Sequence, residues 1–205
     1  MPACLALWIV VLLVGATPVQ GGELTARAYF RMLPATIFEN TPEGLPEEEK
    51  LRLLETGRTE FWELRRETDD LLTLASLPFG ESGVMLRVFR NEGGGHGKSS
   101  GRTLLALGTT GSPLCTLELW RADVNGRIVP VDTPDEPSSK DYFSAQSPMP
   151  PDVRLSILFC VEEEGLEAVP VFWNESGMLF VPVQNRVHYG WRDGQFKKYL
   201  TAVPQ

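Results

Sequence analysis

The stretch RLSILFCVEEEGLEAVPVFWNESGMLFVPVQNRVHYGWRDGQFKKYL, residues 154–200, decides the fold. Its runs of β-branched and aromatic residues alternate with turn residues such as Asp193-Gly194, a dipeptide that tolerates the positive φ of tight hairpins. Residues 117–126, 171–177 and 187–194 share one order of strand, tryptophan, glycine turn and returning strand. Their Trp-to-Gly spacings differ, which argues against a repeat array and favours hairpins of one sheet system.

A period of two in the hydrophobic pattern extends over most of the chain after Gly57 and predicts about ten short strands. The predicted strands are residues 61–67, 71–77, 84–91, 103–108, 114–122, 127–132, 154–162, 166–173, 178–183, 186–191 and 195–200. Turn signals recur between them at short intervals. The expected fold class is therefore mainly β, either an antiparallel two-layer sandwich or a partly closed barrel. The strand order stays open.

The N-terminal part of the chain has a different character. Residues 1–21 carry no charged side chain and contain an apolar run of signal-peptide length, so they are predicted to be a signal peptide, here called the leader, that is cleaved after Gly21. No Lys or Arg precedes this run, so either the amino terminus supplies the charge or the true start lies upstream. Residues 22–57 are predicted to be a helical segment packed on a β domain of residues 58–205. Within that segment, residues 24–33 and 47–55 are predicted helices, the second bounded by Pro46 and Gly57.

The composition is acidic, with 27 Asp and Glu against 19 Lys and Arg and a net charge of −8. Such a surface repels nucleic acid and anionic lipid, so no nucleic acid is expected as a partner and no membrane after leader cleavage. Together with the leader, the composition indicates a soluble periplasmic or secreted protein. Residues 133–152 are rich in proline and are expected to form a surface loop within a single β domain.

Two cysteines are expected to pair. Of the three in the chain, Cys4 lies in the leader, whereas Cys115 and Cys160 lie in predicted strands. In an oxidising compartment these two are expected to form a disulfide that closes a loop of about 45 residues. Each also fits the alternative of a small buried side chain with a free thiol.

The sequence contains no complete catalytic, metal-binding or phosphate-binding motif. Gly97-Lys98-Ser99 matches the tail of a phosphate-binding loop, but Glu92 stands where the head of that motif needs glycine. His96 and His188 have no Cys, Asp or Glu at a zinc-site spacing, so no metal and no cofactor are expected. Candidate carboxylates for acid–base work are Asp69, Asp70, Glu118, Asp132, Asp135, Glu162 and Glu163. None is distinguished by spacing, so no catalytic residue is predicted.

The period of two also assigns faces to three tryptophans. Trp120 falls on the strand face opposite to Cys115, towards solvent or a second layer. There it is either covered by the proline-rich loop or available as a partner contact. By the same rule, Trp173 and Trp191 are expected to belong to a core.

The aromatic hairpins, and an N-terminal helix that leads into a meander, resemble features of small exported bacterial β proteins. The function favoured by the sequence is non-enzymatic binding of a protein or an envelope component, in the cell envelope or the extracellular space. Two alternatives stay open: a hydrolase of an envelope polymer whose carboxylates meet in the fold, and an inhibitor of a basic secreted enzyme. The oligomeric state is not indicated.

Overall fold

The computed structural model describes residues 24–34, 44–78, 80, 82–90, 103–111, 115–122 and 127–204. The predicted leader, the glycine-rich segment around His96 and the Asn125-Gly126 turn lie outside these residues. Within the described part, the fold is mainly β, as predicted, with eleven strands in two antiparallel sheets and three short helices. Neither sheet closes into a barrel.

The first sheet is a meander in which each strand pairs with the next one in the chain. Its strands are β1 (Trp62–Glu67), β2 (Leu71–Ser76), β3 (Gly83–Phe89), β4 (Thr103–Thr110), β5 (Leu117–Ala122) and β6 (Ile128–Val131). Each was predicted to within three residues at either end, because alternating hydrophobicity and turn residues mark both the strands and their limits.

The second sheet has the strand order β11-β10-β8-β7, and β9 pairs with the end of β8. Its strands are β7 (Arg154–Val161), β8 (Gly165–Asn174), β9 (Gly177–Leu179), β10 (Asn185–Arg192) and β11 (Gln195–Ala202). In the β10–β11 turn, Asp193 and Gly194 have φ values of 53° and 77°. This is the positive φ that the Asp-Gly dipeptide predicts.

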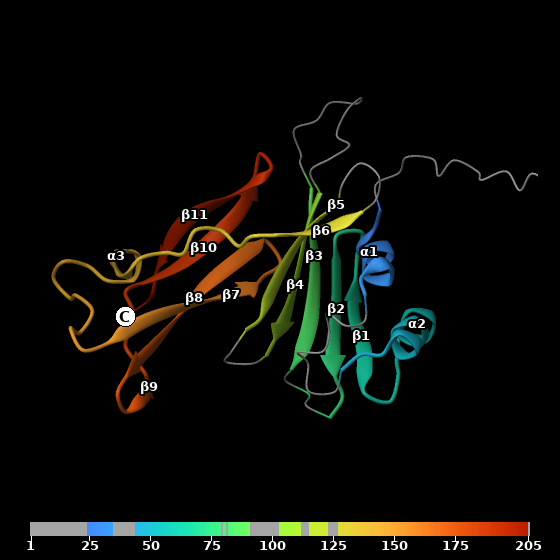
Figure 1. The fold of residues 1–205 in the computed structure, drawn as a ribbon, viewed down its shortest axis with the longest axis horizontal. Coiled ribbons are helices and arrows are strands. Elements are labelled where there is room, and N and C mark those ends of the chain that lie inside the picture. The colour runs from blue at the N-terminus through green and yellow to red at the C-terminus, as the bar shows by residue number, and fades with distance from the viewer. Residues whose placement is uncertain are drawn as a thin grey trace, which may run out of the picture.

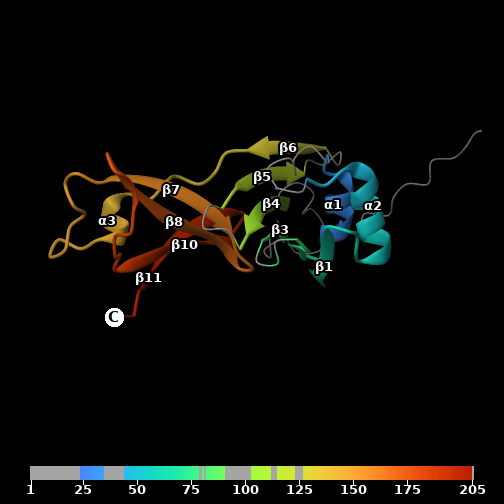
Figure 2. The same ribbon diagram turned by 90° about the horizontal axis from the view of Figure 1, so that it is seen from below.

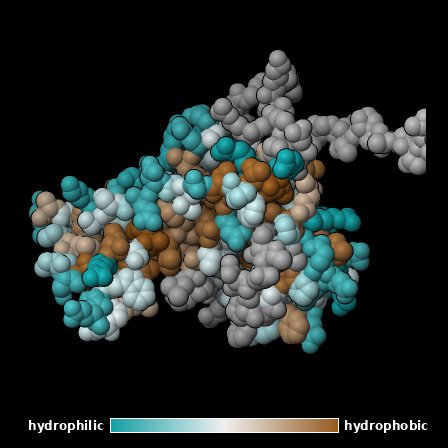
Figure 3. Space-filling view, in the orientation of Figure 1, coloured by the Kyte–Doolittle hydropathy of each residue, from teal (hydrophilic) through white to brown (hydrophobic). Residues whose placement is uncertain are grey.

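The molecule is built in three layers, with α1 (Ala26–Met32) and α2 (Glu47–Thr56) on one face of the first sheet and the second sheet on the other (Figures 1 and 2). The helix-side core joins the helices to the first sheet and includes Phe30, Leu53, Trp62, Leu86 and Leu105. The inter-sheet core includes Phe89, Ala106, Phe159, Leu166, Val187 and Tyr189. Figure 3 shows hydrophobic residues at the surface across the middle of the molecule and hydrophilic residues towards both ends.

The second helix begins and ends where its sequence predicts. Three acidic residues occupy its first turn, and Gly57 ends it in the left-handed conformation with φ 75°. Its buried residue Lys50, only 1% exposed, was not anticipated. The Lys50 ammonium donates to the Leu33 carbonyl at 2.6 Å and pairs with Glu47 at 2.8 Å. Lys50 therefore supplies a donor to the C-terminal end of α1, which would otherwise leave carbonyls unpaired.

Lys50→Met is expected to lower the free energy of unfolding by about 2 kcal/mol, because it leaves a buried carbonyl without its donor. Urea unfolding of the purified chain measures the change. Lys140→Met is the matched control, since that lysine is exposed and forms no hydrogen bond within the described residues. Equal losses in the two variants would contradict the role assigned to Lys50.

Two predicted segments differ from the structure. The strand predicted over residues 178–183 pairs only as far as Leu179, although Val181 and Val183 still pack on the inter-sheet core. Pro182 lacks the N–H that a ladder needs, so the strand pairing is not continued over these residues. The proline-rich loop contains a short helix, α3 (Ser139–Tyr142), whose capping box joins Ser138 to Asp141.

The prediction that Trp173 belongs to a core was wrong, because its side chain is 39% exposed. The face of β8 that packs in the inter-sheet core carries Leu166, Ala168 and Phe172. Trp173 points to the opposite face and pairs across strands with Met178, which is also exposed. Trp191, in contrast, packs against the inter-sheet core as expected.

Candidate binding groove between the two sheets

A groove of about 840 Å³ lies between the two sheets. One wall comes from β4, β5 and β6 and includes Leu104 and Arg121, and the other comes from the β10–β11 hairpin. Residues 132–136, which follow β6, form part of the lining and are called the strap. The groove thus lies where the β10–β11 hairpin of the second sheet, strands β4 to β6 of the first sheet and the strap meet.

Aromatic rings form the floor of the groove. Trp191 and Phe196 face each other across the β10–β11 hairpin, with ring centroids 5.1 Å apart in an edge-to-face arrangement. Phe89 of the first sheet lies 5.3 Å from Phe196 and 5.7 Å from Trp191. The indole N–H of Trp191 donates to the Arg90 carbonyl at 2.8 Å. These contacts across the two sheets fix the rings, so the floor is organised before any ligand binds.

The strap and the α3 segment that follows it are both fastened to the second sheet. The buried Tyr189 hydroxyl donates to the Asp135 carbonyl at 2.6 Å. Beyond the strap, Tyr142 of α3 is fully buried and donates to the Ala168 carbonyl at 2.9 Å. Lys198 pairs with Asp141 at 2.8 Å. The connection between the sheets is therefore an ordered wall, although its composition suggested an ordinary surface loop.

The electrostatics of the groove are set by carboxylates. Burial raises the pKa of Tyr189 to about 12, and the charges of Asp141, Asp135 and Glu136 contribute to that rise. Burial also acts to raise the pKa of Asp141, but hydrogen bonds from Lys198 and Ser138 outweigh it, so this pKa lies below its ordinary value. Asp141 is therefore ionised and neutralised locally by Lys198.

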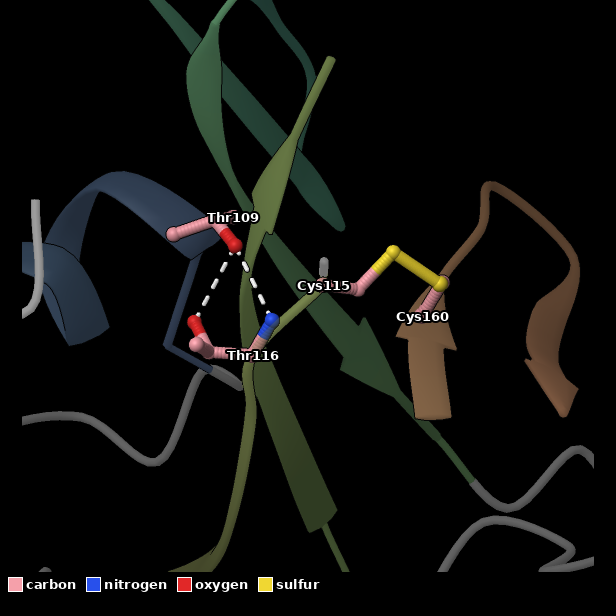
Figure 4. The surroundings of a disulfide bond; sticks show 4 residues. All are labelled: Thr109, Cys115, Thr116 and Cys160. Carbon is pink, nitrogen blue, oxygen red and sulfur yellow. Dashed lines mark hydrogen bonds between the residues drawn. A yellow bond between two sulfur atoms is a disulfide. The ribbon is translucent and has the colours of Figure 1, made fainter. Parts of the chain in front are cut away.

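A disulfide joins the two sheets at a different place. The sulfur atoms of Cys115 and Cys160 lie 2.05 Å apart, as the predicted pairing requires, with 5.2 Å between the Cα atoms (Figure 4). Next to it, the Thr116 N–H donates to the Thr109 hydroxyl at 2.9 Å, which ties the segment before β5 to the end of β4. Cys115 enters from the first sheet and Cys160 from β7 of the second.

The sheets approach closely beside this bond. A Cβ added to Gly108 of β4 would lie 2.7 Å from the Thr116 carbonyl oxygen and 2.9 Å from a methyl group of Val161. No side chain larger than that of glycine fits there without displacement of a strand. Gly108 thus permits the close contact that the disulfide then secures.

Trp120 lies on the strand face opposite to Leu119, as predicted. This face is covered by the layer of helices. It packs against the helix-side core, and the proline-rich loop is not what covers it. Its indole N–H and one carboxylate oxygen of Glu118 are buried, and neither forms a hydrogen bond of good geometry in the described part of the chain. Burial raises the pKa of Glu118, and the nearby indole N–H offsets this only in part. Trp120 as a partner contact stays a prediction.

We expect Trp120→Ala to cost about 2 to 3 kcal/mol of stability, because it removes a ring packed on the helix-side core. Trp173→Ala should cost less than about 1 kcal/mol, since that ring is partly exposed on the outer face. This order reverses the one that the sequence suggests. Thermal and urea unfolding of both variants provide the measurement, and a larger loss for Trp173→Ala would contradict the assignment of faces.

Glu118→Gln should stabilise the protein at pH 7. Because burial raises the folded-state pKa of Glu118 above its ordinary value of 4.5, ionisation of this group opposes folding at neutral pH. The gain should shrink as the pH falls through the raised pKa and vanish below the ordinary value, where the wild-type carboxyl is neutral as well. Urea midpoints at pH 7 and pH 4 give the comparison, with Glu48→Gln at an exposed position of α2 as the control. A gain independent of pH would contradict this explanation.

A second polar cluster lies on the outer face of the second sheet. His188 lies 3.4 Å from Glu162 and 3.0 Å from the Thr201 hydroxyl, and its ring stacks on Tyr199. Burial raises the pKa of Glu167, and the charge of Glu162 and a hydrogen bond with it raise it further. Neither of these two carboxyls lines the groove between the sheets.

The structure separates most of the candidate carboxylates. Asp132 and Asp135 line the groove together with Glu136, a residue that the sequence did not single out. Glu162 and Glu163 follow β7, and Glu118 lies on the helix side of β5. Asp70 lines a separate recess of about 600 Å³ on the other side of Trp191. The groove was missed because it depends on strand order, which the hydrophobic pattern does not encode.

Among the described residues, no group of three or more His, Cys, Asp or Glu side chains is placed to hold a metal ion. None of the helices in that part of the chain is long and apolar enough to span a membrane. The chain matches no family model, and comparison with curated proteins and with solved structures also finds no match.

Proposed function

We propose that the chain is a non-enzymatic binding protein of the cell envelope or the extracellular space, and that it holds part of its partner in the groove between the two sheets. The observation that carries this proposal is the groove itself, with its fixed aromatic floor of Trp191 and Phe196 and its charged strap. Concave sites of this size that combine aromatic surface with a few polar groups are typical of ligand binding.

The arrangement of charges favours binding over hydrolysis. The carboxylates that line the groove all belong to the strap, whereas Arg121 lies on β5. Acid–base hydrolysis of a glycosidic bond needs carboxyl groups that flank the bond, one to protonate and one to attack or to activate water. Within the described lining, no carboxylate lies on β5 or on the β10–β11 hairpin.

Export of the protein is part of the same proposal. The apolar leader of residues 1–21 and the paired cysteines both agree with passage into an oxidising compartment. A groove fixed by contacts and a covalent bond suits a protein that works outside the cytoplasm, where no reducing system opens the bond.

A site-specific crosslinker tests the proposal. The full chain, expressed with its leader in an exporting host, would carry a photoreactive phenylalanine analogue at Gln195, which lines the groove and is exposed. The control carries it at exposed Glu55 of α2, on the far side of the first sheet. We expect a discrete adduct in envelope extract or medium at Gln195 and none at Glu55.

Two results would overturn the binding function. One is the absence of any adduct at Gln195 above that at Glu55. The other is release of soluble fragments from purified envelope polymer by the wild-type chain, which would favour the hydrolase alternative.

A further inference from the structure

The strap carries three carboxylates that have no ion pair. Asp132, Asp135 and Glu136 are exposed and line the groove, and none of them forms a salt bridge within the described residues. Asp141, only a few residues further on, is paired with Lys198. Within the described residues, no ion pair therefore neutralises the three carboxylates of the strap.

The rest of the lining is not uniformly negative. Arg121 faces the groove from β5 and forms no salt bridge in the described part of the chain. The rings of Trp191 and Phe196, on the β10–β11 hairpin, form the floor and are half-buried. Aromatic faces attract cations, and they also accept the aliphatic stems of long side chains. The lining thus offers the three carboxylates of the strap, an aromatic floor and Arg121, together with Lys198, which is paired with Asp141.

On the basis of the binding function proposed above, we propose that the groove takes an extended polypeptide segment that carries lysine or arginine side chains. The cationic ends meet the carboxylates of the strap, while their stems lie on Trp191 and Phe196. Arg121 donates to a main-chain carbonyl or a carboxylate of the same segment. Charge complementarity of this kind raises the association rate and selects the partner.

Other ligand classes fit the same lining less well. A nucleic acid is repelled by the strap and by the net charge of −8. A neutral saccharide uses aromatic rings but leaves three carboxylates without counter-charges. A simple polycation meets the strap but is repelled by Arg121 and Lys198, which line the same groove.

Titration of labelled peptides tests the inference. The probes are three fluorescent Gly/Ser peptides of equal length that carry lysine, glutamine or glutamate at the same positions, and fluorescence anisotropy measures binding to the full chain. One variant combines Asp132→Asn, Asp135→Asn and Glu136→Gln. A control variant combines Glu48→Gln, Glu55→Gln and Glu60→Gln, which makes the same change in net charge at exposed positions away from the groove.

We expect the wild type and the control variant to bind the lysine peptide about tenfold or more tightly than the glutamine peptide. In the strap variant this difference between the two peptides should disappear. Equal loss in the control variant would mean that net charge alone is responsible, and it would overturn the inference. Equal binding of the lysine and glutamine peptides would also overturn it.

The crosslinker at Gln195 separates this failure from that of the binding function. If an adduct persists there but peptide charge has no effect, the binding function stands and the partner class is wrong. If the adduct is absent as well, both proposals fail. An adduct whose sequenced peptide contains no lysine or arginine also counts against the inference.

Discussion

Removal of the Cys115–Cys160 bond in Cys115→Ser/Cys160→Ser should lower the free energy of unfolding by about 4 kcal/mol, the largest effect that we expect. The bond closes a loop of 45 residues and joins the two sheets, so its loss frees many conformations of the unfolded chain. Urea unfolding measures the difference. Wild type in excess reductant should unfold at the midpoint of the double variant.

Protein recovered from its native compartment provides the chemical control. Alkylation and mass spectrometry of unreduced, denatured chain should find Cys115 linked to Cys160. Two alkylated thiols would contradict the bond, and an unchanged urea midpoint in the double variant would contradict its role in stability.

Gly165→Ala should cost about 3 kcal/mol, because the new methyl group has no room. A Cβ at this position would lie 2.1 Å from the Tyr189 carbonyl oxygen, a backbone atom of the neighbouring strand β10. Neither strand can move without breaking the ladder that also positions the groove. Gly80→Ala is the matched control, since nothing lies within 4 Å of a Cβ there.

Urea unfolding of both glycine variants measures the change. Because the strain falls on the strand that carries Trp191, we also expect weaker crosslinking at Gln195 in Gly165→Ala. Equal stability of the two variants would show that β8 and β10 can separate at no cost, contrary to the contact described.

β3 could be predicted because buried and half-buried residues alternate along much of it, as the hydrophobic pattern does. In β4, Leu104 and the three residues after it are all buried, so both faces are covered and a continuous apolar run marks the strand. The capping box of Ser138 and Asp141 was also legible in the sequence, but the prolines around it favoured a loop. Thus α3 was missed although a signal for it was present.

The faces of β8 could not be predicted by the same rule. Val171 on its outer face is buried, as is Phe172 on its inner face. Both faces are therefore apolar, and the period of two does not tell which one points inwards. Trp173 was assigned to a core for this reason. The groove could not be predicted from the strands alone, because the strap and the β10–β11 hairpin come together only when the two sheets pack on each other.

Each sheet is formed by one continuous half of the chain, the first ending at Val131 and the second beginning at Arg154. Between these halves the backbone passes only once, through the segment that contains the strap and α3. A protease that cut this segment would leave two fragments that stay joined through Cys115 and Cys160. The nicked protein would migrate as one species without reductant and as two with it. Because of the disulfide, a cut in the segment between the sheets would not separate the two halves of the chain.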